Sequence, residues 1–199
     1  MLKEEKAALR RATMGVLRAL EPAERASRSV AVTTRYAALP EWRDSREVLG
    51  YFPMSVEVDV LPLLESALGE GRKVWLPRIE EGRLVFRRVH DLDGDLETHP
   101  YGMREPLARL EAFDPSSAEG AVIVVTPGLA FDAGGHRLGR GKGYYDAFLG
   151  SARGSARVPF RAIAVAFAEQ VVPSVPHGER DMKVDAVVTD RDLLRAPRR

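Results

Sequence analysis

The stretch from Ala121 to Leu149 limits the folds open to this chain more than any other part of the sequence. It begins with an apolar, β-branched run over residues 121–125, which predicts a strand buried on both faces, as in a parallel sheet. Thr126-Pro127-Gly128 ends that strand, a glycine-rich loop follows, and residues 144–149 predict the beginning of a helix. A strand, a glycine-rich loop and a helix often form an anion site, because glycines let backbone amides approach the anion and the helix N-terminus adds positive potential.

The loop matches neither of the two common phosphate-binding motifs. Three cations, Arg137, Arg140 and Lys142, lie among its glycines. A Walker A loop requires a glycine at the position of His136 and a Ser or Thr at the position of Gly143. The dinucleotide fingerprint requires Gly-x-Gly-x-x-Gly, whereas residues 139–143 read Gly-x-Gly-x-Gly. The loop therefore predicts an anion site of unassigned type, and an ordinary surface loop remains the alternative.

Helical patterns alternate with apolar strands along the rest of the chain. Helices are expected at residues 2–20, 22–38 and 58–68 and from residue 144; strands are expected at residues 47–52, 73–76, 83–89, 121–125, 161–167 and 184–189. This alternation predicts a single α/β domain over residues 1–199, with a mostly parallel β-sheet flanked by helices on both faces.

The remaining segments are expected to connect these elements. Residues 91–117 predict a long loop, residues 150–159 a polar, mobile linker, and residues 191–199 a frayed tail. Ligands of such sheets bind at the carboxyl ends of the strands. The glycine-rich loop, the turn after Phe52 and the segment after Phe167 are therefore expected at one edge of the sheet.

Composition narrows the classes of partner. The 199 residues include 30 basic and 29 acidic residues, and this balance argues against a nucleic-acid partner. The absence of cysteine excludes disulfides, thiolate nucleophiles and cysteine metal sites. The apolar runs are too short to span a bilayer, and the charged N-terminus lacks an apolar signal segment. We expect a cytoplasmic monomer that binds small molecules, without a nucleic-acid or membrane partner.

Several charged residues are candidates for a site. Asp146 and Asp181 could hold Mg²⁺ together with phosphate oxygens, or they could be an acid near a helix N-terminus and a turn residue. Glu57 follows a strand end and could bind a polar ligand group, although a helix-start acid is the more frequent case. Lys6 and Arg10 share a helical stripe that, on spacing alone, indicates a solvated face.

The histidines at positions 90, 99, 136 and 177 lack metal-ligand spacing, and no Ser/His/Asp arrangement can be read. The residues alone thus predict a magnesium-nucleotide-binding α/β enzyme acting on a small molecule. A phosphate-binding regulator or binding module remains open.

The string PGLAFDAGGHRLGRGKGYYD closely resembles the signature of the 5-formyltetrahydrofolate cyclo-ligases, also called 5,10-methenyltetrahydrofolate synthetases. Four further segments agree in the family's order: Lys6-x-x-x-Arg10, Met54-x-x-Glu57, Leu76-Pro77-Arg78, and residues 179–185 (ERDMKVD). Residues 102–106 also look like the family's Gly-x-x-Glu-Pro element.

The resemblance implies a reaction in which ATP and 5-formyltetrahydrofolate give 5,10-methenyltetrahydrofolate, ADP and phosphate with Mg²⁺. The formyl oxygen attacks the γ-phosphate to give an N5-iminophosphate, N10 attacks the activated carbon, and phosphate leaves. No protein nucleophile is required, so catalysis rests on positioning and charge stabilisation. This fits a sequence that offers glycines, cations and carboxylates.

The resemblance also implies roles for individual residues. Arg140 and Lys142 are implied as catalytic, and Asp146 and Asp181 as ligands of Mg²⁺. The implied ATP-binding residues are Lys6, Arg10, Arg137, Leu138, Gly139, Arg140, Gly141, Lys142, Gly143, Tyr144 and Tyr145. The implied substrate-binding residues are Phe52, Glu57, Arg140, Gly141, Lys142, Gly143 and Tyr144. Tyr101 and Glu105 are weaker candidates for the pterin pocket.

The chain departs from the family pattern at Val60, where Thr is frequent, and at Ala147, where a larger residue is usual. Residues 91–100 match poorly. Neither substitution removes a charged group from the implied chemistry. The alternatives are a non-catalytic folate or nucleotide sensor on the same scaffold, and a kinase-like or acyl-transferase-like enzyme with another substrate.

Overall fold

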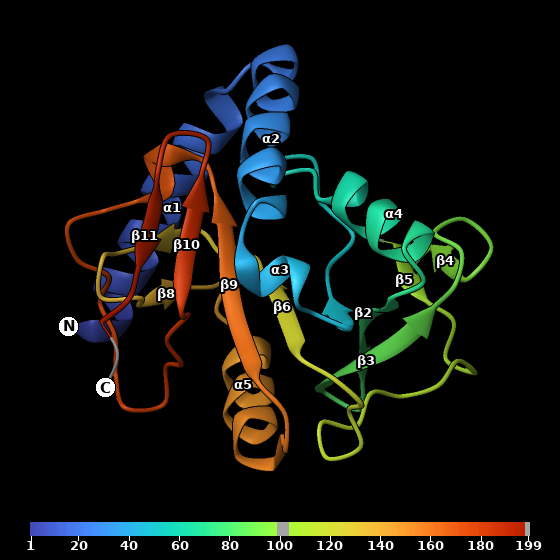
Figure 1. The fold of residues 1–199 in the computed structure, drawn as a ribbon. Helices are drawn as coiled ribbons and strands as arrows, with labels where there is room; N and C mark the ends of the chain where they lie inside the picture. The colour runs from blue at the N-terminus through green and yellow to red at the C-terminus, as the bar shows by residue number, and fades with distance from the viewer. Residues whose placement is uncertain (99–103, 198–199) are drawn as a thin grey trace.

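A seven-stranded sheet forms the centre of the computed structural model, which describes residues 1–98 and 104–197 (Figure 1). The strand order is β11-β10-β9-β6-β1-β2-β3. Their bounds are β1 Glu47–Leu49, β2 Lys73–Glu80, β3 Arg83–Val89, β6 Val122–Thr126, β9 Phe160–Ala166, β10 Ala186–Thr189 and β11 Leu193–Arg195. The five inner strands are parallel, and the edge strands β3 and β11 are antiparallel to their neighbours. The expected mostly parallel α/β sheet is therefore confirmed.

Helices cover both faces of this sheet, as expected (Figure 1). Their bounds are α1 Leu2–Ala19, α2 Pro22–Ala37, α3 Pro40–Arg43, α4 Leu61–Gly69 and α5 Tyr144–Ser155. Successive strand residues point to opposite faces. Thus Val48 packs in the core beneath α2 and α4, whereas Leu49 packs in the core beneath α5. In the described ranges, no helix is both long and apolar enough to cross a bilayer.

Two segments expected to be irregular are ordered elements. Helix α5 continues to Ser155 because Leu149 and Ala152 bury their side chains against the sheet, so the expectation of a linker from residue 150 is wrong for its first six residues. The tail was expected to fray, yet β11 pairs with β10, with Val187 opposite Leu194. The prediction of a frayed tail is therefore wrong for residues 193–195, because strand β10 supplies hydrogen-bond partners for their backbone.

The loop expected at residues 91–117 also contains structure. It includes the paired short strands β4 Leu96–Thr98 and β5 Arg104–Pro106.

The hairpin of β2 and β3 turns at Glu81 and Gly82, whose φ angles are 48° and 75°. Two positive φ angles in a two-residue loop match the right-handed twist of the strands.

A small hairpin lies inside the glycine-rich stretch, where the sequence predicted only loop. Strand β7, Ala130–Phe131, pairs with β8, Arg137–Leu138. The 3-10 helix η1, Ala168–Gln170, follows β9, and the Gln170 side chain donates hydrogen bonds to the carbonyls of Gly128 at 2.8 Å and Leu129 at 3.2 Å. The glycine-rich stretch and the segment after Phe167 therefore meet at one edge of the sheet, as expected.

Candidate functional site

Asp132 fixes the turn between β7 and β8. Its buried carboxylate accepts hydrogen bonds from the amides of Gly134, His136 and Val175 at 2.9–3.1 Å. Burial alone would raise the pKa of Asp132, but these hydrogen bonds and the contact with His136 lower it below its ordinary value. Sequence reasoning assigned no role to Asp132, although an Asp two residues before a glycine is a frequent Asx-turn signal.

The apex of the loop exposes backbone and cations to solvent. Arg140, Gly141, Lys142 and Gly143 are all exposed. Gly141 has a φ of 104°, and Gly143, the N-cap of α5, has a φ of 73°, a region that disfavours residues with a Cβ. Among the described residues no side chain caps α5, so its first-turn amides are open to an anion.

Helix α1 brings two cations against this loop. Arg10 donates its Nε–H to the carbonyl of Gly139 at 2.9 Å, and a Cβ added to Gly141 would lie 3.3 Å from the Arg10 Cζ. Lys6 forms an ion pair with Asp181 at 2.5 Å. Arg10 therefore contacts the glycine-rich loop and Lys6 contacts the Asp181 turn. The prediction from spacing that these two residues form a solvated face is wrong.

Arg137 and Lys142, two of the three loop cations, lie in different environments. The Arg137 side chain is only 3% exposed and donates to Asp146 Oδ1 at 2.8 Å, with its guanidinium 5.4 Å from the centre of the Tyr145 ring. Lys142 is exposed and has no ion-pair partner in the described part of the chain. Leu138 is buried with Ala130 and Val175, so its side chain supports the hairpin.

Asp146 and Asp181 are neighbours in the folded protein. Asp146 Oδ1 accepts from Arg137 and from the Met182 amide, and Asp181 Oδ2 accepts from Lys6 and the Gly178 amide. Over residues 1–98 and 104–197, the other oxygen of each carboxylate has no hydrogen-bond partner. Burial would raise the pKa of Asp181, but the hydrogen bonds from Lys6 and Gly178 lower it, so this carboxylate is ionised at neutral pH.

This donor set fits Mg²⁺ that arrives with a nucleotide. Mg²⁺ takes one or two carboxylates and completes its octahedron with phosphate oxygens and waters. Among the described residues, no three or more His, Asp or Glu side chains gather into a protein-only metal site. Two adjacent carboxylates, each with a free oxygen, meet the smaller requirement.

Glu57 joins the turn after β1 to the glycine-rich loop. Its Oε1 accepts from Arg140 at 2.9 Å, and its Oε2 accepts from the Met54 amide at 3.0 Å. The sequence placed these segments at one edge of the sheet, and this contact confirms it. The nearby Phe52 ring has the Arg104 guanidinium 5.2 Å from its centre.

Aromatic residues of α5 extend the site toward the core. Tyr144, in the first helical turn, is half-buried. The Tyr145 hydroxyl is buried, and it has no hydrogen-bond partner among the described residues. Its burial, with the Glu57 charge, raises the pKa of Tyr145 well above the ordinary value, so it stays protonated and can donate. Of the weaker candidates, Tyr101 lies outside the described residues, and Glu105 pairs with Arg78 at 3.1 Å.

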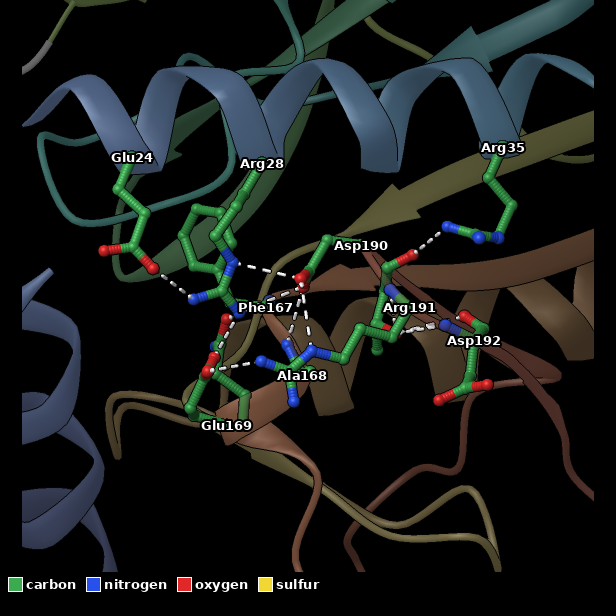
Figure 2. Close-up of polar contacts among 11 residues, drawn as sticks. Glu24, Arg28, Arg35, Phe167, Ala168, Glu169, Asp190, Arg191 and Asp192 are labelled. Atoms are coloured by element: carbon green, nitrogen blue, oxygen red, sulfur yellow. Dashed lines mark hydrogen bonds and ion pairs between the residues drawn. The ribbon is translucent and has the colours of Figure 1, made fainter.

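A second polar cluster, which the sequence did not indicate, lies where β9 and β10 end. Figure 2 shows Arg28 of α2 in contact with Glu24, Glu169 and Asp190. Asp190 also accepts from the Ala168 amide at 2.8 Å. Each of these carboxylates is engaged by a cation or an amide, so the cluster ties α2 to the sheet edge.

Comparisons with known proteins agree with this geometry. Residues 2–190 match the model of the 5-formyltetrahydrofolate cyclo-ligase family. The mouse 5-formyltetrahydrofolate cyclo-ligase is 30% identical over 176 residues, covering 86% of this chain and 87% of the mouse protein. The structure of Aquifex aeolicus 5,10-methenyltetrahydrofolate synthetase is 32% identical with a TM-score of 0.80, covering 98% of this chain and 94% of that one.

A structure of 5,10-methenyltetrahydrofolate synthetase from Mycoplasma pneumoniae has a TM-score of 0.70 at 19% identity, covering 93% of this chain and 98% of that one, and it supports the fold alone. The family match spans the glycine-rich loop, the two carboxylates and the α1 cations together. The resemblance stated from the loop signature is confirmed, and the chain belongs to the 5-formyltetrahydrofolate cyclo-ligase family.

Proposed function

We propose that this enzyme cyclises 5-formyltetrahydrofolate to 5,10-methenyltetrahydrofolate, with ATP converted to ADP and phosphate and with Mg²⁺ as cofactor. The observation that supports this most is the meeting of α1, the glycine-rich loop and the Asp181 turn around exposed cations and open amides. Such a site suits a triphosphate. The family supports the choice of substrate, and the geometry supports a triphosphate site beside it.

The proposed reaction needs no covalent bond between the protein and either substrate. The formyl oxygen attacks the γ-phosphorus and ADP departs, which leaves an iminophosphate at N5. N10 then attacks the formyl carbon, and phosphate leaves with the former formyl oxygen and the N10 proton as the ring closes. Each step moves negative charge among phosphate oxygens, so fixed donors and cations lower the barrier.

The proposed role of each residue follows from its position in the site. The exposed Arg140 and Lys142 neutralise charge on the transferred phosphate, while Lys6, Arg10 and the amides from Gly139 to Tyr145 hold the triphosphate. Asp146 and Asp181 would hold Mg²⁺ by their free oxygens, and the ion would supply charge neutralisation between phosphates. The buried Arg137 orients Asp146, which is a positioning role rather than a direct phosphate contact.

Folate is expected between the turn after β1 and the loop. Glu57 is held from two sides, by Arg140 and by the Met54 amide, so its carboxylate has a fixed direction. It would accept hydrogen bonds from a polar edge of the substrate, with Phe52 and Tyr144 beside the ring. The Glu57–Arg140 ion pair connects the two substrates and gives a direct route for one to orient the other.

The test is the appearance of methenyltetrahydrofolate absorbance from 5-formyltetrahydrofolate, ATP and magnesium. We expect the absorbance to rise only when all three are present and to be accompanied by equal amounts of ADP. Binding of both ligands without turnover would instead identify a non-catalytic folate or nucleotide sensor. Binding of ATP without any binding of folate would point to a kinase-like or acyl-transferase-like enzyme with another substrate.

A further inference from the structure

A cavity of about 690 Å³ lies at the amino ends of β9 and β10, the edge of the sheet opposite the carboxyl ends of these strands. Its walls come from the last turn of α5, the start of β9, the segment before β10 and the end of β11, and Glu41 of α3 lines it as well. Helices α3 and α5 lie on opposite faces of the sheet, so the cavity reaches both faces (Figure 1). Its volume is within the range of small-molecule sites.

Cations outnumber carboxylates in the lining of this cavity. The charged lining residues are Glu41, Arg153, Arg161, Lys183, Asp185 and Arg195. Apolar side chains, among them Val158, Pro159 and Pro197, form much of the remaining wall. The lining thus combines a net positive charge with apolar surface.

One cluster of these charges lies on the face covered by α3. Arg195 forms an ion pair with Glu41 at 2.6 Å. Phe160 and Ala162 pack in the core beneath α5, so Arg161 between them points to the α3 face. The hydrogen bond from Arg195 lowers the pKa of Glu41 below its ordinary value, and the charge of Arg161 adds to this lowering. Among the described residues, the Arg161 side chain has no ion-pair or hydrogen-bond partner.

The second cluster lies beside α5. Arg153 donates to the Lys183 carbonyl at 2.8 Å and forms an ion pair with Asp185 at 2.8 Å. Asp185 Oδ2 also accepts from the Ala162 amide at 2.7 Å, which fixes this carboxylate to β9. Over residues 1–98 and 104–197, the Lys183 ammonium has no ion-pair partner. Each cluster therefore has one cation more than it has carboxylates.

We propose that this cavity binds a small organic dicarboxylate, with one carboxylate paired to Arg161 and the other to Lys183. Guanidinium and ammonium groups bind carboxylates by charge-assisted hydrogen bonds. The apolar wall of Val158, Pro159 and Pro197 contacts the carbon chain of the ligand. The inference is independent of the proposed function, because neither Arg161 nor Lys183 takes part in the proposed reaction.

Calorimetric titration of the full chain with glutarate tests the proposal, and pentanoate, which has the same carbon chain but a single carboxylate, is the control ligand. Arg161→Gln and Lys183→Gln each remove one cation from the cavity and keep a hydrogen-bonding side chain. Arg157→Gln is the matched control, because it removes an exposed arginine that precedes β9 but does not line the cavity. Lys142→Ala shows whether glutarate binds at the glycine-rich loop instead.

We expect the wild type to bind glutarate about tenfold more tightly than pentanoate. Arg161→Gln and Lys183→Gln should each weaken glutarate binding about tenfold, the lower end for loss of one hydrogen bond to a charged group. Arg157→Gln and Lys142→Ala should bind glutarate like the wild type.

Three results would overturn the inference and leave the proposed function standing. The first is a wild type that does not bind glutarate, or that binds pentanoate equally well. The second is equal weakening in Arg157→Gln and Arg161→Gln, which would indicate attraction by the general surface charge. The third is weakening in Lys142→Ala alone, which would place glutarate at the glycine-rich loop.

Discussion

Arg137 and Arg140 lie three positions apart in the glycine-rich loop, yet their side chains lie in different environments. Arg137 is buried against Asp146 and Tyr145, while Arg140 is 41% exposed and reaches Glu57. The difference follows from β8, which turns the Arg137 side chain inward, and from the loop apex, which leaves Arg140 at the surface. At the scale of single residues, charge type alone therefore does not identify a phosphate ligand.

Lys142→Ala should abolish most of the activity and leave the fold intact. The Lys142 side chain is exposed, so its truncation removes no buried contact. Loss of one charge-stabilising contact in a transition state costs about 2.7–4 kcal/mol, or a factor of ~10²–10³ in rate. The absorbance assay and a thermal melt check both parts of this prediction.

The control for that variant is Lys73→Ala, at the amino end of β2, where Lys73 pairs with the exposed Glu119. It removes the same charge far from the carboxyl edge of the sheet and should retain wild-type turnover. Full activity in Lys142→Ala and Arg140→Ala would reject the assignment of the loop.

Asp146→Asn should raise the magnesium concentration needed for half-maximal activity by about tenfold or more, on the order of the cost of disturbing a metal site. It should also lower stability by about 1–3 kcal/mol, because the buried Arg137 loses a charged hydrogen-bond partner. A magnesium titration and denaturant unfolding measure the two effects. An unchanged magnesium titration would remove Asp146 from the metal site and leave it as the partner of Arg137.

At the scale of elements, long-range polar contacts hold α1 and α2 in place. Helix α1 contacts the loop through Lys6 and Arg10, and α2 contacts the ends of β9 and β10 through Arg28 (Figure 2). The Arg28 partners, Glu169 and Asp190, come from two segments that follow neighbouring strands. These contacts fix the helices relative to the edge that carries the site.

Asp190→Asn should weaken the protein at neutral pH and reduce its loss of stability in acid. Burial would raise the pKa of Asp190, but Arg28 and the Ala168 amide lower it below its ordinary value. A carboxylate with a lowered folded-state pKa stabilises the protein above its unfolded pKa of ~3.9 and loses this effect as the pH falls through its folded-state pKa.

Denaturant unfolding of wild type and Asp190→Asn from pH 7 to acid tests this. The variant should be less stable by about 1–3 kcal/mol at pH 7, as for a lost hydrogen bond to a charged group. The difference should shrink below pH ~4. A constant difference at every pH would mean that the carboxylate contributes by shape and not by charge.

Strand β11 offers a matched pair of substitutions. Leu194 packs on the core beneath α5, whereas its neighbour Leu193 is 36% exposed. Leu194→Asp should lower the free energy of unfolding by about 2 kcal/mol or more, because a charge replaces a packed side chain. Leu193→Asp should change it by less than about 0.5 kcal/mol. Equal effects in chemical denaturation would show that β11 does not dock on the sheet in solution.

The whole molecule is a sheet covered on both faces by helices (Figure 1). Its candidate site residues lie at the carboxyl edge of the sheet. Cations and carboxylates from Lys6 to Asp181 meet there, although 175 positions separate these two in sequence. The parallel strands end at the same edge, which gathers the segments that follow them, and the packing of α1 against that edge brings Lys6 to Asp181.

The protein is expected to be a monomer. In the described ranges, the exposed large apolar residues come from several separate elements, including Val16 of α1, Val30 of α2, Ile79 of β2 and Leu193 of β11. Single exposed apolar residues are normal on monomers, and stable dimers need a contiguous patch. Light scattering should give the mass of one chain at micromolar concentration, and a dimer mass would contradict this.

The sequence by itself determined the alternation of helices and strands, the glycine-rich loop and the family. These depend on local patterns: apolar periodicity fixes the buried strands, and positions such as Gly141 and Gly143 need a left-handed backbone that glycine provides without strain. The signature of the loop carries the resemblance for the same reason, because its residues are contiguous.

Only the tertiary structure decided which groups meet. Whether Arg137 faces a ligand or Asp146, whether residues 193–195 fray or pair with β10, and whether His136 stacks on His177 all depend on contacts between distant segments. Burial and ion pairing are properties of the packed molecule, so no local pattern encodes them. The sequence named the candidate charged residues of the site, and packing decided which of them are paired and with what partner.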